Sequence, residues 1–144
     1  MEDRYDLQRF IKAQNSVYAQ VVSELRAGRK RSHLMWFIFP QISGLGRSDM
    51  AQRFAISSLE EAIAYLNHPV LGARLEECAR LVNAVNGSSI EQIFGRPDDM
   101  KFHSSMTLFA RASPANQVFS QALKKYFAGR LDASTLERLA WPTD

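Results

Sequence analysis

The residues best suited to chemistry lie together between Gly28 and Ser48, in the stretch GRKRSHLMWFIFPQISGLGRS. This stretch joins three adjacent cations to six consecutive apolar residues and a turn with two glycines. Core packing alone does not require that combination. Cations, flat aromatic faces and accessible backbone amides are what a site for a phosphate-bearing ligand needs. The sequence therefore predicts a pocket for a small anionic, nucleotide-like ligand, and leaves open whether the domain is also an enzyme.

A second polar segment, DDMKFHSSMT at residues 98–107, has more polar residues than a packed helix needs. It would complete the site if it lay against the first segment. Together the two segments supply the predicted ligand-binding residues, which are Arg29, Lys30, Arg31, His33, Trp36, Gln41, Gly44, Gly46, Arg47, Ser48, Lys101, Ser104 and Ser105.

Three residues are candidates for acid or base catalysis: His33, His103 and Asp99. Asp99 and His103 are four residues apart, so on a helix they face the same way, and the carboxylate would favour the protonated imidazole. That spacing could orient a general acid or base. A surface ion pair or a capped core histidine explains the same spacing without catalysis.

Several kinds of site lack the motifs that would support them. The three histidines are widely separated and have no carboxylate or cysteine at ligand spacing, so we predict no metal site and no cofactor. The glycine turn does not continue into G-x-G-x-x-G, because position 49 is aspartate, and neither G-K-[ST] nor G-x-S-x-G occurs. Any nucleotide site would therefore be of another kind.

The net charge of +3 is concentrated in one part of the chain. Between Leu25 and Leu59 there are six cations and one anion, whereas the remainder carries twelve cations and fourteen anions. A compact anion site fits this distribution better than an extended nucleic-acid surface. We therefore place small-molecule binding first, a protein-interaction module that docks an acidic partner through the basic and aromatic segment second, and nucleic-acid binding third.

Helical periodicity runs through most of the chain. Apolar residues at spacings of three and four predict one long helix over residues 6–28 and further helices up to the C-terminus, with caps at Ser48, Ser58 and Ser134. Residues 34–39 are ambiguous between helix and strand. The expected fold is all-α, a compact single domain over residues 1–144 with seven or eight helices.

Composition suits a small folded domain, because 46% of the 144 residues are hydrophobic. No apolar run approaches the roughly 20 residues that span a bilayer, and the first ten residues are too charged for a signal peptide. We therefore expect a cytoplasmic protein without a membrane segment, as a monomer or a weak dimer. The single cysteine, Cys78, lies among apolar residues and is expected to be a buried thiol.

Four segments of the chain also carry a family resemblance: GRKRSHLMWFIFPQISGLGRSDMAQRFAI, AYLNHPVLGARLEECARLV, DDMKFHSSMTLFARA and FAGRLDASTLERL. They resemble the bacterial domain-of-unknown-function family numbered 1810, from Tyr5 to Leu139. The resemblance implies a compact, mainly helical single domain without an established activity. The label calpastatin, given to some members, does not suit this chain, because the animal protease inhibitor of that name is largely disordered and polar.

Overall fold

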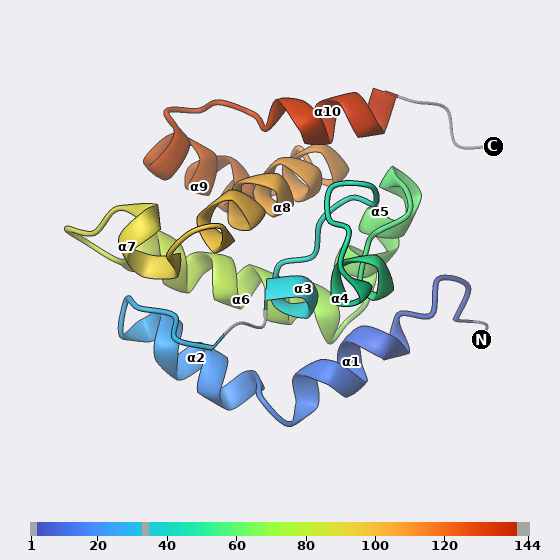
Figure 1. Cartoon of the computed structure of the whole chain (residues 1–144), viewed down its shortest axis with the longest axis horizontal. Coiled ribbons are helices and arrows are strands. Elements are labelled where there is room, and N and C mark those ends of the chain that lie inside the picture. The colour runs from blue at the N-terminus through green and yellow to red at the C-terminus, as the bar shows by residue number, and fades with distance from the viewer. Residues whose placement is uncertain (1–2, 33–34, 141–144) are drawn as a thin grey trace.

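Helices make up nearly all the regular structure of this protein (Figure 1). The computed structural model describes residues 3–32 and 35–140, and His33 lies outside them. Its ten helices are α1 (Gln8–Asn15), α2 (Tyr18–Arg26), α3 (Met35–Ile38), α4 (Asp49–Arg53), α5 (Leu59–Asn67), α6 (Leu71–Ala84), α7 (Ile90–Phe94), α8 (Asp98–Ala112), α9 (Gln117–Phe127) and α10 (Ala133–Ala140). The all-α prediction is confirmed.

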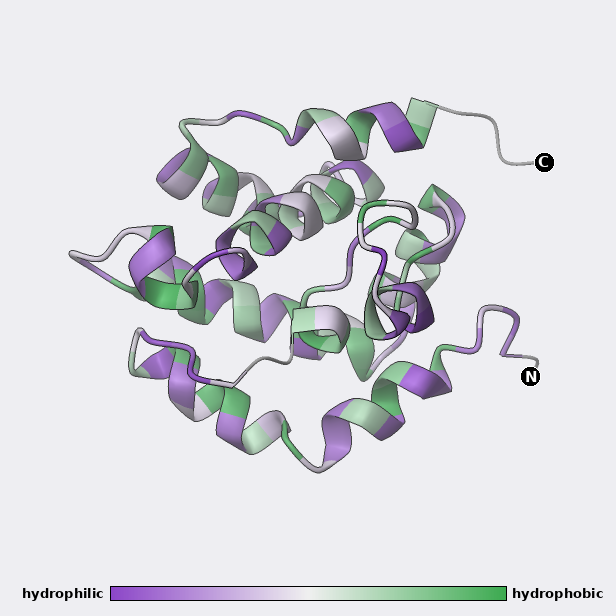
Figure 2. Cartoon of the chain, in the orientation of Figure 1, coloured by the Kyte–Doolittle hydropathy of each residue, from purple (hydrophilic) through white to green (hydrophobic). Residues whose placement is uncertain are grey.

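Helix α8 is the centre of the core. Figure 1 shows it in the middle of the molecule, and it packs against α3, α5, α7, α9 and α10. Its core face is formed by Phe102, Met106 and Phe109, which are fully buried. Figure 2 shows hydrophobic and hydrophilic residues on different sides of the long helices, as expected of helices that each bury one face. In the described part of the chain, no helix has the length and apolar character that crossing a bilayer requires.

The single helix predicted over residues 6–28 is wrong, because the chain breaks it into α1 and α2. Val17 leaves the helical conformation, with φ −125° and ψ −6°. Just before the break, the buried amide of Gln14 donates from Nε2 to the Phe37 carbonyl (2.6 Å) and to the Tyr65 hydroxyl (3.1 Å). Helix α1 packs on α3, and α2 packs on α6. The two halves thus bury their apolar faces against different neighbours.

The ambiguous run at residues 34–39 contains a single helical turn, α3, and no strand within its described residues. The chain that follows pairs with residues beyond α4: Ile56 N–H donates to the Gln41 carbonyl, and Ser43 N–H to the Ile56 carbonyl, both at 2.8 Å. Ser48 then caps α4 as predicted, since its hydroxyl accepts from the Ala51 amide at 3.1 Å. The loop between α3 and α4 is therefore held near its start by the pairing with Ile56 and at its end by the Ser48 cap.

The cap at Ser134 is wrong, because Asp132 begins α10 instead. Its Oδ2 accepts from the Thr135 amide (3.1 Å) and the Thr135 hydroxyl (2.6 Å). The same oxygen accepts from the Ser104 hydroxyl at 3.1 Å, and the Asp132 amide donates to the Thr107 hydroxyl at 2.9 Å. Asp132 therefore both caps α10 and joins it to α8. Asp132 lies two positions before Ser134, and its short side chain fits this role because it reaches both helices.

Replacing Asp132 with alanine should lower the free energy of unfolding by about 2 kcal/mol, since it removes a helix cap together with a charged hydrogen-bond acceptor. Urea denaturation followed by circular dichroism would measure the change. Ser134→Ala is the matched control, because Ser134 is exposed; we expect a change within about 0.5 kcal/mol. Equal losses in the two variants would contradict the assignment of the cap.

Candidate functional site

The two predicted segments meet in space, around Asp98. Lys30 Nζ lies 3.7 Å from Asp98 Oδ2, and Lys101 Nζ lies 3.5 Å from Asp98 Oδ1. The Lys101 ammonium also sits over the Trp36 ring, 5.0 Å from its centroid. We call Lys30, Trp36, Asp98 and Lys101 the basic-aromatic cluster. It joins the segment before α3, α3 itself and the first turn of α8.

Within this cluster the two lysines have different surroundings. The Lys30 side chain is 1% exposed, whereas that of Lys101 is 25% exposed. Burial lowers the pKa of the Lys30 ammonium, while the carboxylates of Asp98 and Glu24 act in the opposite direction without cancelling the effect. Lys30 also donates to the Ser32 carbonyl. Lys30 therefore holds the segment in place, and Lys101 is the cluster's cation that a ligand can reach.

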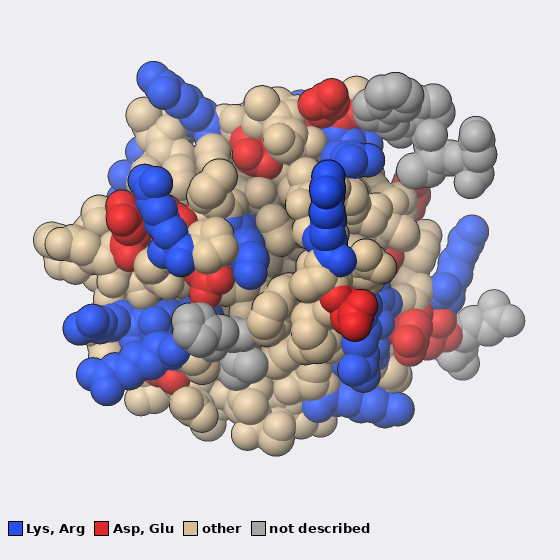
Figure 3. Space-filling view, viewed as in Figure 1, with Lys and Arg blue, Asp and Glu red and all other residues tan. Residues whose placement is uncertain are grey.

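Glu24 on α2 fixes the backbone of the basic segment. Its Oε1 accepts hydrogen bonds from the Arg31 amide (2.8 Å), the Ser32 amide (2.9 Å) and the Ser32 hydroxyl (3.0 Å). Burial raises the pKa of the Glu24 carboxyl, but these hydrogen bonds outweigh burial and leave the pKa lowered. With the backbone held inward, the side chains of Arg29 and Arg31 are exposed. Figure 3 shows Lys and Arg side chains gathered over the end of α2 and the segment after it.

The two predicted serines differ in their surroundings. Ser104 donates to Asp132 and faces α10, so it belongs to the helix cap described above. Ser105 is fully buried, and its hydroxyl has no hydrogen-bond partner among the described residues. Ser105 lies four residues after Lys101, so the two share a face of α8. Buried hydroxyls are nearly always paired, which marks this face of α8 as unusual.

The predicted pairing of Asp99 with His103 is not formed. Asp99 Oδ2 lies 3.7 Å from the Arg96 guanidinium, and its Oδ1 accepts from the Met100 amide. The His103 ring stacks on Phe127, with centroids 3.9 Å apart and planes 8° from parallel, and its Nε2 lies 2.8 Å from the Arg130 carbonyl. The two side chains thus have separate partners, which favours a structural role for both.

The remaining predicted residues lie in the loop between α3 and α4. Gly44 has φ +95°, a left-handed backbone conformation that favours glycine. A Cβ on Gly46 would approach the Ala51 Cβ to 2.5 Å. Arg47 is exposed, and Gln41 is half-buried. Within the described residues, no hydrogen bond or ion pair joins this loop to the basic-aromatic cluster, so its part in ligand binding stays a prediction.

The residue that sequence reasoning missed at this site is Asp98. Asp98 and Asp99 lie in the first turn of α8, where the exposed backbone amides favour negative charge, so acidic residues are expected there without any role in a site. The spacing from Asp98 to Lys101 was the available signal, because residues three apart on a helix are neighbours. The contact with Lys30 could not be found this way, since it joins residues far apart in the chain.

The described residues give no support for thiol or metal chemistry. Cys78 is buried as predicted, and burial raises the pKa of its thiol to about 12. A thiol with that pKa stays protonated near neutral pH and is a poor nucleophile. In the described ranges, no group of three or more His, Cys, Asp or Glu side chains is placed to hold a metal ion.

Comparison with known proteins places the chain in a family. The family model described as "Protein of unknown function (DUF1810)" matches residues 4–139. The chain belongs to this family. A crystal structure of another protein, the conserved hypothetical protein Rv1873 from Mycobacterium tuberculosis, is 61% identical in sequence and superposes with a TM-score of 0.96. The match covers 97% of this chain and 100% of that one.

These similarities establish the fold and the family of this DUF1810 domain, and they assign it no activity. The comparison with curated proteins gives no match.

Proposed function

We propose that this DUF1810 domain binds a small phosphate-bearing ligand, of the nucleotide or sugar-phosphate class, at the basic-aromatic cluster. The observation that carries the proposal is the position of Lys101. Its ammonium is partly exposed, lies over the face of Trp36 and shares Asp98 with Lys30. One carboxylate therefore pairs with two ammonium groups, so a phosphate could pair with Lys101 without displacing an exclusive partner.

The neighbouring groups support an anionic ligand with an aromatic part. Trp36 is half-buried, so part of its ring is open to a base or another flat group. Arg29 and Arg31 are exposed on the segment that Glu24 and Lys30 hold in place. Because this backbone is already ordered, a ligand would not have to order it on binding, which favours affinity.

Lys101→Met should weaken binding of such a ligand at least about tenfold, because a hydrogen bond to a charged group contributes about 1.5–3 kcal/mol. The measurement is thermal unfolding in the presence of inorganic phosphate, nucleoside monophosphates, ADP-ribose and sugar phosphates. A ligand at about 100 times its Kd should stabilise the native protein by about 2.7 kcal/mol.

Lys124→Met is the matched control for this experiment. Lys124 is an exposed lysine on α9, outside the cluster, so its removal should leave the ligand-induced stabilisation unchanged. The proposal fails if none of these ligands stabilises the protein, or if the stabilisation persists undiminished in Lys101→Met.

A second candidate function is docking of an acidic protein partner. It is favoured by Arg26 at the end of α2 and by Arg29 and Arg31 just after it, which are exposed and form no ion pair with any described residue. Arginine is a frequent anchor of protein interfaces. A pull-down that Arg29→Ala abolishes, together with no response to small ligands, would favour this function over the first. A salt-sensitive gel shift with RNA or DNA would instead favour nucleic-acid binding.

A further inference from the structure

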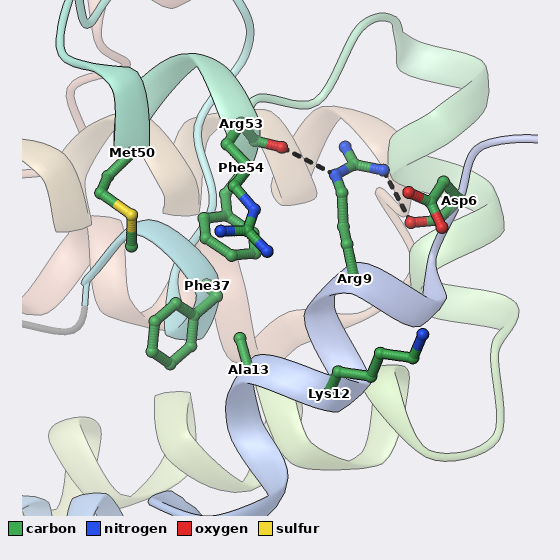
Figure 4. Close-up of a pocket in the computed structure, with 8 residues that line it drawn as sticks. All are labelled: Asp6, Arg9, Lys12, Ala13, Phe37, Met50, Arg53 and Phe54. Carbon is green, nitrogen blue, oxygen red and sulfur yellow. Dashed lines mark hydrogen bonds between the residues drawn. The ribbon is translucent and has the colours of Figure 1, made fainter.

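A groove separate from the basic-aromatic cluster lies between α1, α3 and α4. It has a volume of about 440 Å³, within the range of small-molecule pockets. Figure 4 shows that one side is apolar, formed by Phe37 of α3, Met50 of α4 and Phe54 just after α4. The two phenyl rings pack edge to face, with centroids 5.2 Å apart. Phe37 and Phe54 are 5% and 3% exposed and Met50 is half-buried, so this side of the groove is a firm but small apolar wall.

Arg9 forms part of the opposite side, and its guanidinium is fully engaged. Its Nε donates to the Arg53 carbonyl at 2.9 Å, and its Nη1 donates to the Asp6 carbonyl at 2.9 Å. Its Nη2 donates to the Ala55 carbonyl at 2.9 Å and to Glu61 Oε2 at 3.0 Å. Because Glu61 balances its charge and its donors are used, Arg9 shapes the groove and is not available to a ligand.

Two further cations of the groove remain available. The side chains of Lys12 and Arg53 are exposed, and neither forms an ion pair with a described residue. The Arg53 guanidinium lies over the Phe54 ring, 5.3 Å from its centroid, and Figure 4 shows it across the face of that ring. The lining carries one acidic side chain, Asp6, against these two cations. After the pairing of Arg9 with Glu61, the groove thus keeps a net positive charge beside an apolar wall.

We propose that this groove binds a small amphipathic anion, with a single carboxylate or phosphate on an aromatic or aliphatic body. The body covers the apolar wall at Phe37, Met50 and Phe54, the anion pairs with Arg53, and Lys12 adds positive charge on the other side of the groove. Both halves of the ligand are required, because a neutral apolar molecule leaves the cations unused and an inorganic anion leaves the wall uncovered. This site does not depend on the ligand proposed for the basic-aromatic cluster.

The probe for the test is 4-phenylbutyrate, and its neutral amide is the matched control compound. Titration of the ¹⁵N-labelled protein, followed by amide chemical shifts, should give saturable changes at Ala13, Met50 and Phe54. The amide should bind at least about tenfold more weakly, since it loses the charged hydrogen bonds. Equal binding of the two compounds, or no saturable change up to about 10 mM, would overturn the proposal.

The double variant Lys12→Met with Arg53→Met tests the cations directly. Both residues are exposed, so the fold should be retained, and binding of 4-phenylbutyrate should fall at least about tenfold. Lys124→Met should bind as the unaltered protein does. Undiminished binding of 4-phenylbutyrate by the double variant contradicts the proposal. Binding that is weakened by Lys101→Met but not by the double variant also contradicts it, because the probe would then occupy the basic-aromatic cluster.

Discussion

Phe102→Ala should lower the free energy of unfolding by about 4 kcal/mol, because it removes a fully buried ring and leaves a cavity among other rings. Phe102 lies 5.0 Å from the Phe39 ring and 4.9 Å from the Phe94 ring, measured between centroids, and is fully buried. Phe39 and Phe94 also contact each other, at 5.8 Å. The three rings join α8 to the residue after α3 and to α7. Because the cavity left by Phe102→Ala is bounded by several elements, the movement of one of them would close little of it.

Urea denaturation of Phe102→Ala and of the unaltered protein measures this loss. Met100→Ala is the control on the same helix, because Met100 is 64% exposed and its truncation should change stability by less than about 0.5 kcal/mol. A loss below about 2 kcal/mol for Phe102→Ala would mean that the core collapses into the cavity, against the tight packing inferred here.

The aromatic trio also bears on function. Lys101 precedes Phe102 on α8, and Trp36 lies on the short helix that Phe39 follows. Packing of Phe102 against Phe39 therefore fixes the distance between α3 and the start of α8, and with it the position of Lys101 over Trp36. We expect Phe102→Ala to weaken ligand binding at the cluster even where the protein remains folded.

Much of the fold could be predicted from sequence because the signals are local. Ser58 caps α5, Ser89 and Gln92 form a capping box on α7, and Gly129 follows the end of α9, as their residue types indicate. The break between α1 and α2 was missed because both halves keep the same helical periodicity. It depends on Gln14 finding the Phe37 carbonyl and the Tyr65 hydroxyl, which are remote in sequence.

The candidate site could be predicted only in part, because it too depends on contacts between residues that are remote in sequence. Residue types pointed to Lys101 and Trp36, and these two do meet. Residue type alone could not show that Lys30 would be buried on Asp98. It also could not reveal the groove at α1, because Lys12 and Arg53 are ordinary surface cations until the fold sets them beside Phe37 and Phe54.

Arg9→Met should lower the free energy of unfolding by about 3 kcal/mol, the cost expected when one partner of a largely buried ion pair is removed. The side chains of Arg9 and Glu61 are 15% and 3% exposed, and their charged atoms lie 3.0 Å apart. Methionine keeps an unbranched aliphatic stem and removes the guanidinium, whose Cζ lies 4.4 Å from the Phe10 ring centroid, so the loss reports the guanidinium. The same guanidinium bonds carbonyls around α1 and at the end of α4, which methionine cannot do.

The double variant Arg9→Met with Glu61→Gln separates the loss of the Arg9 hydrogen bonds to carbonyls from the cost of leaving the Glu61 carboxylate buried without its partner. Removing the Glu61 charge relieves the buried, unpaired carboxylate, so the double variant should lose less stability than the sum of the single losses. Arg80→Met is the matched control, because Arg80 pairs with Glu76 at 3.4 Å on the surface and is 65% exposed. Exposed pairs contribute at most about 1 kcal/mol. If Arg9→Met costs no more than Arg80→Met, Arg9 does not anchor α1 to α4 and α5, and the groove it shapes would not be fixed by the fold.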